Sequence, residues 1–357
     1  MIKMKILVTG GAGFVGSHVA EYYAKRGDEV IVFDNLSRGK MLGKSVDGLL
    51  YNWNHLKSNY DNVKLVKGDV RDFEKLKLSL SEVDAIIHTA AQVAVTSSLS
   101  DPRTDFEVNV LGTFNALEVA RLSDAAVVYA STNKVYGGNV NKIPVKEREK
   151  RYYFADERYR GGIPEDFPID LCGHSPYGCS KLAADLYVQD YAHTYGLKTG
   201  VFRLSCIYGE RQFGVEDQGW VAWFVIAALT NRPITIYGDG KQVRDILYVK
   251  DLVKAFDAFI NSNLKHEVFN LGGGRGNTLS LLELLDLLEE LTGKRPRIFF
   301  ADWRLMDQKV YISDISKAKQ LLHWEPKVSL KESMKKLVEW VERKHKSLEQ
   351  SNRRVRT

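Results

Sequence analysis

The sequence predicts an α/β protein: a doubly wound parallel sheet with helices on both faces, followed by a smaller C-terminal lobe. Three observations support this fold class. Short apolar runs alternate with helical stretches from Lys5 onward, the first run leads directly into a glycine-rich turn, and the alternation fades past Ile207. Continuous apolar strands joined by helical crossovers are typical of a parallel sheet that is covered on both faces.

The expected strands follow one another along the first part of the chain. They are the apolar runs 6–8, 30–33, 63–66, 85–87, 126–129 and 200–202. A helix is predicted over Ser180 to Tyr195, because this stretch comes just after Ser175-Pro176 and proline favours a helix start. We therefore expect a first domain over residues 1–206, a smaller lobe mainly over residues 207–345, and a basic tail over residues 346–357.

Short elements are expected in the smaller lobe, over residues 220–230, 234–236 and 279–291. Two polar-aromatic stretches, near residues 41–61 and 139–170, lack a clear periodicity. Long stretches without a regular pattern are often lids or binding loops. We interpret both as insertions into the first domain that form lids or contact surfaces.

The composition is that of an ordinary globular protein, with 44% hydrophobic and 27% charged residues in 357. The formal charge of +6 is partly local to the C-terminus, and no aromatic residues are interleaved there as in a nucleic-acid arm. Three cysteines give neither a disulfide framework nor metal-ligand spacing. The longest apolar run, residues 222–229, is far short of the roughly 20 residues of a membrane helix. We expect a cytoplasmic protein that binds neither nucleic acid, membrane nor metal, and that has no signal peptide.

A glycine-rich turn joins the first strand to the first helix. Gly10, Gly13 and Gly16 let backbone amides approach a pyrophosphate, and the following helix N-terminus adds partial positive charge. Asp34 closes the second strand, where a carboxylate hydrogen-bonds ribose hydroxyls and repels a 2′-phosphate. Arg38 argues the other way, since a guanidinium could accept that phosphate. Because the carboxylate lies at the strand end itself, the pattern favours a Rossmann domain that binds NAD.

Tyr177 and Lys181 are predicted to act together. Residues four apart on a helix lie on one face, so the ammonium could stabilise a phenolate and lower a pKa that is normally about 10. Two other tyrosine-lysine pairs have the same spacing, but one runs into a strand-like segment and the other spans two turn glycines. We expect His18 and His88 to be hydrogen-bonded core residues rather than catalytic groups.

These motifs resemble those of the extended short-chain dehydrogenases/reductases that act on nucleotide sugars, the NAD-dependent epimerase/dehydratase family. The resemblance covers nearly the whole chain and includes Gly68-Asp69-Val70 and Val135-Tyr136-Gly137. It implies tightly bound NAD and transient oxidation of a sugar carbon, with Tyr177 as base, Lys181 on the nicotinamide ribose and Thr132 on the reacting hydroxyl. The implied cofactor-binding residues are Gly10, Gly13, Phe14, Val15, Gly16, Asp34, Asn35, Ser37, Arg38, Asp69, Val70, Ala90, Ala91, Gln92, Asn109, Ser131, Tyr177, Lys181 and Leu204.

The segment after Thr132 distinguishes branches of this family. In the sugar 4,6-dehydratases the two residues after the threonine are Asp-Glu, an acid/base pair that eliminates water. Here they are Asn133 and Lys134. The amide exchanges no proton at useful pH and the lysine has the wrong charge for the carboxylate's role, which argues against dehydration.

The segments 131–137, 175–181, 208–213, 217–220 and 240–245 are most similar to those of the CDP-paratose 2-epimerase branch, also called CDP-tyvelose 2-epimerase. This resemblance implies a 2-keto intermediate: hydride leaves C2 of the sugar for NAD⁺ while Tyr177 takes the hydroxyl proton, and the hydride then returns to the other face. Two alternatives stay open. One is a 4-epimerase or decarboxylase on the same scaffold, and the other is a catalytically silent NAD-binding protein.

The substrate implied by the resemblance is a nucleotide-diphosphate sugar, and the expected assembly is a homodimer or homotetramer. Cationic side chains in loops of the second lobe would hold the diphosphate, because arginine suits bidentate phosphate recognition. Cys206 stands where many relatives have an asparagine, and Leu305 where they often have a proline. The expected substrate-binding residues are Thr132, Asn133, Cys206, Arg211, Gln212, Trp220, Lys241, Gln242, Arg244, Arg304 and Asp307.

Overall fold

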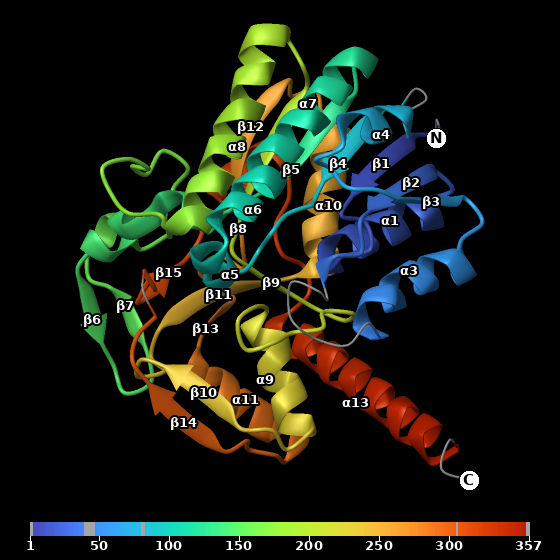
Figure 1. Cartoon of the computed structure of the whole chain (residues 1–357). Coiled ribbons are helices and arrows are strands. Elements are labelled where there is room, and N and C mark those ends of the chain that lie inside the picture. Colours follow the sequence, from blue (N-terminus) through green and yellow to red (C-terminus); the bar gives the residue numbers. More distant parts are fainter. Residues whose placement is uncertain (1–2, 39–46, 80–82, 305, 355–357) are drawn as a thin grey trace.

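A parallel sheet forms the centre of the computed structural model, which describes residues 3–38, 47–79, 83–304 and 306–354 (Figure 1). Within those residues seven strands pair in the order β3-β2-β1-β4-β5-β8-β12, every neighbour parallel. They are β1 (Lys5–Thr9), β2 (Glu29–Asp34), β3 (Val63–Lys67), β4 (Ala85–His88), β5 (Ala126–Thr132), β8 (Thr199–Leu204) and β12 (His266–Leu271). The predicted doubly wound sheet is confirmed, and β12 joins it from beyond residue 206.

Helices cover both faces of this sheet. On one face lie α1 (Phe14–Arg26), α10 (Val249–Ile260) and α12 (Ser316–Leu322), with part of α3 (Asp47–Asn59); on the other lie α4 (Phe73–Leu78), α7 (Gly112–Ser123) and α8 (Ser175–Tyr195). Val19 and Phe256 pack into the first layer, and Leu117 and Val188 into the second. Each such side chain contributes about 1.5–3 kcal/mol by leaving water.

The ends of α8 agree with local sequence signals. Pro176 occupies the first turn, where a missing backbone N–H costs no hydrogen bond. Gly196 ends the helix with a φ of 72°, in the left-handed region that glycine adopts without strain. The helix therefore starts at Ser175, five residues before the predicted start, and places Tyr177 in its first turn.

A second lobe lies below the sheet in Figure 1 and has its own apolar core. Phe224, Leu285 and Leu337 meet there at full or nearly full burial. Its strands are β9 (Cys206–Tyr208), β10 (Ile234–Tyr237), β11 (Val243–Tyr248), β13 (Thr278–Ser280), β14 (Ile298–Ala301) and β15 (Val310–Tyr311). Its helices are α9 (Trp220–Leu229), α11 (Leu281–Thr292) and α13 (Leu330–Arg354). The backbone of α13 runs into the stretch expected as a basic tail, of which residues 355–357 lie outside the described residues.

The two predicted insertions contain regular structure. The first forms α3, while residues 41–46 lie outside the described residues. The second begins within the 3-10 helix η2 (Asn133–Lys142) and supplies its end, then the hairpin β6 (Val145–Glu147) and β7 (Tyr152–Phe154) and the short helix η3 (Glu157–Tyr159). The hairpin packs on the second lobe, where Tyr152 N donates to Lys241 O at 2.9 Å.

Between β4 and β5 the chain forms α5 (Val95–Ser100), α6 (Pro102–Phe106) and the π-helix η1 (Glu107–Leu111), which continues into α7. These short helices contact α8 beside the carboxyl edge of the sheet. No helix in the described part of the chain combines the length and apolarity that crossing a bilayer requires.

Candidate active site

A cavity opens at the carboxyl edge of the sheet beside β1 and β4, where the order of strands reverses. Open α/β sheets bind ligands at this kind of position. The glycine turn forms its floor: a Cβ on Gly10 would lie 2.7 Å from the backbone of Ala90, and one on Gly16 would lie 2.3 Å from Gly10 O. Only glycine fits there, so the turn approaches the neighbouring loop as closely as two backbones allow.

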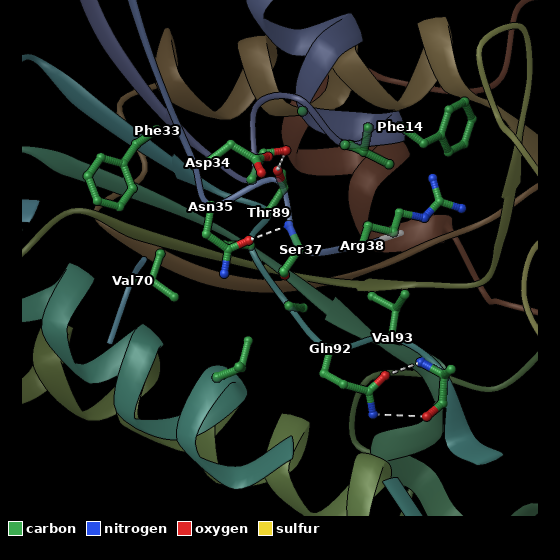
Figure 2. Close-up of a pocket in the computed structure, with 18 of the residues that line it drawn as sticks. Phe14, Phe33, Asp34, Asn35, Ser37, Arg38, Val70, Thr89, Gln92 and Val93 are labelled. Atoms are coloured by element: carbon green, nitrogen blue, oxygen red, sulfur yellow. Dashed lines mark hydrogen bonds between the residues drawn. The ribbon is translucent and has the colours of Figure 1, made fainter. Parts of the chain in front are cut away.

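Figure 2 shows Asp34, Asn35 and Arg38 along one side of this cavity and Gln92 and Val93 along another. The predicted residues that line it come from the ends of β1, β2 and β4 and the loop after β3. They are Gly10, Gly13, Phe14, Val15, Gly16, Asp34, Asn35, Ser37, Arg38, Val70, Ala90, Ala91 and Gln92. The sequence pattern thus located one continuous cavity from separate segments.

Asp34 and Arg38 give this cavity its polar groups. Asp34 accepts hydrogen bonds from Ala12 N at 3.0 Å and Leu36 N at 2.7 Å, and burial raises its pKa. Arg38 donates to Gln218 Oε1 at 2.8 Å, and its buried Nε has no partner among the described residues. These groups fit the adenosine half of a dinucleotide. The glycine turn at the N-terminus of α1 suits a pyrophosphate, as does the unpaired guanidinium N–H of Arg38, and the Asp34 carboxylate at the strand end suits the ribose.

Tyr177 and Lys181 of α8 lie against the end of β5, which carries Thr132. Thr132 is the last residue of β5, and its hydroxyl is close enough to hydrogen-bond the phenol of Tyr177. Lys181 Nζ donates to Ala130 O at 2.7 Å and lies 4.2 Å from the centre of the Tyr129 ring. All three predicted catalytic side chains are buried, at 8%, 9% and 3% exposure for Thr132, Tyr177 and Lys181.

Burial dominates the protonation of this group. It raises the pKa of Tyr177 to about 12, against the hydrogen bond with Thr132, and it lowers the pKa of Lys181 to about 7. The expectation that Lys181 lowers the phenol's pKa is therefore wrong for the chain by itself. Both groups lose water, and both are driven toward their neutral forms.

A network of buried polar side chains holds α8 in place beside β5. Ser180 donates to Asp105 and accepts from Asn109 Nδ2 at 3.0 Å, while Asn109 Oδ1 accepts from Gln92 N at 2.8 Å. Ser131 donates to Asp185 at 2.7 Å. Asn109 and Ser131, predicted as cofactor contacts, therefore act in this structure by holding α8 and the loop after β4 in register.

The facing wall of the cleft comes from the second lobe. Arg244 Nη2 donates to Asp307 Oδ1 at 2.6 Å, and Cys206 Sγ accepts from Trp220 Nε1 at 3.3 Å. Arg304 lies 4.1 Å from the centre of the Tyr237 ring and pairs with Asp217 at 3.0 Å. Cys206, Trp220, Arg244 and Asp307 thus lie near one another, and Arg304 lines a cavity together with Asp307. Their role as substrate contacts stays a prediction.

Comparisons with known proteins agree with this geometry. Residues 6–272 match the NAD dependent epimerase/dehydratase family. The chain belongs to this family. It is 42% identical to the CDP-paratose 2-epimerase of Salmonella typhi over 94% of this chain and 99% of that one. Like its family, it uses NAD.

Solved structures give the same result. A UDP-glucose 4-epimerase from Thermotoga maritima, solved with UDP-glucose, matches with a TM-score of 0.79 and 33% identity, covering 96% of this chain and 99% of that one. The UDP-glucose 4-epimerase of Thermus thermophilus, solved with NAD, matches with a TM-score of 0.76 and 32% identity, covering 95% and 99%. The fold of this epimerase-family chain is therefore confirmed over almost its whole length.

Four residues predicted as substrate contacts have hydrogen-bond or ion-pair partners within the protein. Arg211 pairs with Glu21 of α1 at 2.6 Å, and Lys241 pairs with Glu147 of the hairpin. Gln212 donates to Ile207 O at 3.1 Å, and Gln242 donates to Tyr237 O at 2.7 Å. These side chains fix loops of the second lobe, because each satisfies a neighbouring carboxylate or carbonyl.

Asp69 and Leu204 lie outside the lining of the cofactor cavity. Asp69 pairs with Arg71 at 2.9 Å and accepts from Asn35 Nδ2 at 2.9 Å, and the hydrogen bond from Arg71 lowers its pKa to about 2. Asp69 therefore orients Asn35, which does line the cavity. Gly68 and Thr89, which adjoin predicted residues, also line the cavity, and sequence reasoning missed these further lining residues: Phe33, Val93, Ala94, Ser97, Val108 and Gln218.

Both histidines predicted as core residues are buried and hydrogen-bonded. His88 lies 2.7 Å from Thr9 Oγ1 and 3.1 Å from Thr113 Oγ1, and His18 lies 2.8 Å from Glu210 O. Burial lowers the pKa of each to about 3, so both are neutral at physiological pH. The prediction is confirmed. Among the described residues there is no group of three or more His, Cys, Asp or Glu side chains that could hold a metal.

Proposed function

We propose that this protein is an NAD-dependent epimerase that inverts C2 of a nucleotide-diphosphate hexose through a transient 2-keto intermediate. The observation that carries the proposal is the pair Asn133-Lys134 directly after Thr132, at the buried end of β5. An amide and an ammonium there leave the ketone to be reduced again rather than dehydrated. The 42% identity to a CDP-paratose 2-epimerase supports C2 as the reacting carbon.

The protein's residues have distinct roles in this reaction. Tyr177 takes the proton of the reacting hydroxyl and later returns it, while Thr132 donates a hydrogen bond to the sugar oxygen. NAD bound in the cavity would supply the hydride acceptor in its oxidised form, with a positive charge that favours the phenolate, and the hydride donor in its reduced form. Lys181 keeps α8 against β5 and faces the cofactor ribose. Because the hydride returns to the other face of the ketone, the sugar ring must rotate within the cleft between the two steps. The hydroxyl oxygen must lie within reach of Tyr177 both before and after this rotation.

The wall of the second lobe binds the nucleotide. Arg304 and the pair Arg244–Asp307 offer guanidinium groups to the diphosphate and a carboxylate to a ribose hydroxyl. Cytidine is our first choice of base, because the similar Salmonella protein acts on a CDP-sugar. We further propose that the enzyme works in the cytoplasm, since Cys172, Cys179 and Cys206 are all free thiols.

The domain division follows the same chemistry. We propose that residues 1–206, together with β12 and the helices α10 and α12, carry the cofactor. The remainder of residues 207–345 carries the nucleotide. The assembly that we propose is a homodimer or homotetramer.

A second candidate, a 4-epimerase, is favoured by the structural similarity to UDP-glucose 4-epimerases. The two are separated by incubating the purified protein with CDP-, GDP-, UDP- and dTDP-glucose and identifying the hydrolysed sugars. Mannose means inversion at C2, and galactose means inversion at C4. With substrate deuterated at C2, we expect the label to remain at C2 in the epimer. Loss of label to solvent, or formation of a 4-keto-6-deoxy sugar, contradicts the proposal.

A further inference from the structure

Lys134 is a cation in the substrate cleft that the mechanism above does not use. It is the second residue of η2, and its backbone N–H donates to Thr132 Oγ1 at 3.3 Å. Its side chain is half-buried, and burial lowers its pKa. Among the described residues, no acceptor lies within hydrogen-bonding distance of its Nζ.

The charged groups that face Lys134 belong to the opposite wall. They are Arg244 and Asp307, with the Cys206 thiol beside them. The Asp307 carboxylate is already bonded to Arg244 Nη2 at 2.6 Å and to Gln308 N at 3.0 Å. Lys134 and Arg244 are two cations facing the single carboxylate of Asp307, so this region carries a surplus positive charge. A half-buried ammonium without a hydrogen-bond partner among the described residues is energetically unfavourable unless it binds an anion.

The chemistry of the substrate says which anion this is. In a nucleotide-diphosphate hexose the diphosphate is attached through an oxygen to C1, which is the carbon next to C2. A sugar that presents its C2 hydroxyl to Thr132 and Tyr177 therefore brings its sugar-bound phosphate close to them. A sugar that presents C4 directs C1 and its phosphate to the opposite side of the ring.

We propose that Lys134 binds the sugar-bound phosphate of the substrate and thereby selects C2 rather than C4 for reaction. The proposal rests on the proposed function. Lys134 is suited to this because its backbone is anchored beside Thr132 while its ammonium is unpaired. Arg244 and Arg304, which we also place on the diphosphate, each have a carboxylate partner, Asp307 and Asp217, whereas Lys134 Nζ has none among the described residues.

The test compares a nucleoside diphosphate with its monophosphate, because only the diphosphate carries the second phosphate. The pair CDP and CMP is measured by titration calorimetry, with the uridine, guanosine and thymidine pairs alongside, and the base that binds most tightly is used. We expect Lys134→Met to reduce the preference for the diphosphate by about tenfold or more, as for loss of a hydrogen bond to a charged group. Lys134→Arg should retain the preference.

The matched control is Lys150→Met. It removes an exposed lysine of the β6–β7 hairpin that pairs with Asp286 of α11 at 2.7 Å. It should leave both affinities unchanged, and bound NAD measured in every variant reports that the protein is folded. An unchanged diphosphate preference in Lys134→Met overturns the inference. A parent protein that binds no diphosphate more tightly than its monophosphate overturns the proposed function instead.

The second readout is the position of reaction. With a hexose substrate, Lys134→Met should lower kcat/KM and should produce a measurable share of C4 epimer, because the phosphate no longer fixes the ring. Products are separated after hydrolysis. A variant with reduced diphosphate affinity and no change in the C2 to C4 ratio refutes the selective role of Lys134.

Discussion

Tyr177 and Lys181 are both almost completely buried, and burial shifts their pKa values in opposite directions. The phenol keeps its proton to higher pH and the ammonium loses its proton at lower pH. The polypeptide alone therefore does not hold Tyr177 as a phenolate at physiological pH. The positive charge of a bound, oxidised cofactor would favour the phenolate, and it would tie proton removal to the presence of the hydride acceptor.

Replacing Tyr177 by phenylalanine should remove the proton acceptor while the ring still packs against η2. We expect turnover to fall by about 10² or more, in line with the usual contribution of a general base. NAD content should not change, because Tyr177 does not line the cofactor cavity. The control is Tyr195→Phe, at the exposed end of the same helix. A Tyr177 variant within tenfold of the parent means that another group takes the proton.

The lowered pKa of Lys181 predicts a pH dependence of stability. Between about 7 and the unfolded value of 10.5, the unfolded chain binds a proton that the folded chain has lost, so folding stability should rise with pH in that window. Below pH 7 the folded protein carries the full cost of the buried charge. Lys181→Met should therefore melt at higher temperature than the parent at pH 6, and its advantage should shrink toward pH 10.

Thermal melts at several pH values check this, with Lys254→Met, an exposed lysine of α10, as the control. We expect Lys181→Met to be inactive while it is more stable. A Lys181→Met variant that is less stable than the parent at pH 6 contradicts the assignment of a destabilising buried charge.

At the scale of elements, α3 connects the cofactor turn to the second lobe. Asn52, which is 2% exposed, donates to Ala12 O at 3.2 Å and Gly13 O at 3.3 Å, directly behind the glycine turn. Tyr51 contacts the rings of Phe213 and Trp340, so the same helix touches the loop before α9 and the helix α13. In Figure 1, α3 lies beside α13 at the edge of the molecule.

This arrangement predicts that α3 retains the cofactor. Asn52→Leu keeps roughly the volume of the side chain but removes its hydrogen bonds to the turn: Gly13 O keeps the bond from Ser17 N, whereas Ala12 O loses this donor, at a cost of about 1–3 kcal/mol for a buried acceptor. We expect the purified variant to carry less NAD and to release it about tenfold faster, as measured from denatured extracts and by dialysis.

Asn59→Leu, at the exposed end of α3, is the matched control and should retain NAD as the parent does. Equal NAD content in both variants would show that the turn is rigid without α3. A loss of NAD in the control as well would mean that the helix as a whole, rather than Asn52, is responsible.

The difference between what could and could not be predicted follows from the range of the interactions. The strands, the glycine turn and the presence of α8 depend on neighbouring residues, so apolar runs and Ser175-Pro176 were sufficient to predict them, although α8 starts five residues earlier than predicted. The position of Arg211 depends on Glu21, which lies on the first helix of the other domain. The α3 helix likewise packs through Asn52 and Tyr51 on partners far away in the sequence, and no local periodicity indicated it.

The catalytic group shows the same division. Spacing placed Tyr177 and Lys181 on one helical face; in the structure Tyr177 lies beside Thr132, and Lys181 contacts Ala130 of the same strand. Their protonation could not be derived from spacing, because it depends on the water that β5 and α8 exclude together. Lys134 was noticed only as an unsuitable acid/base residue, and its unpaired position became evident once the second lobe faced it.

At the scale of the whole molecule, exposed apolar side chains gather on the outer layer of the sheet. Helices α7 and α8 contact each other and lie side by side on this face (Figure 1). Large apolar side chains are 37% to 57% exposed on α6, α7 and α8 and in the turn between them; they are Phe106, Leu111, Phe114, Leu122, Leu186, Tyr187 and Tyr195. Several large exposed apolar side chains on neighbouring helices are typical of a protein interface.

We expect two copies to associate through this face, because one surface pairs with itself about a two-fold axis and two helices from each copy then bury their apolar sides. A stable interface of this type covers more than about 1,000 Å² in total. Leu122→Glu combined with Leu186→Glu places charges in the interface and should convert the dimer to a monomer in light scattering at micromolar concentration. Leu171→Glu, at a side chain that is 92% exposed in the loop before α8, should leave the dimer intact. Because the catalytic cleft lies on the carboxyl edge of the sheet rather than on this face, we expect the monomeric variant to retain bound NAD; a double variant that stays dimeric would place the interface elsewhere.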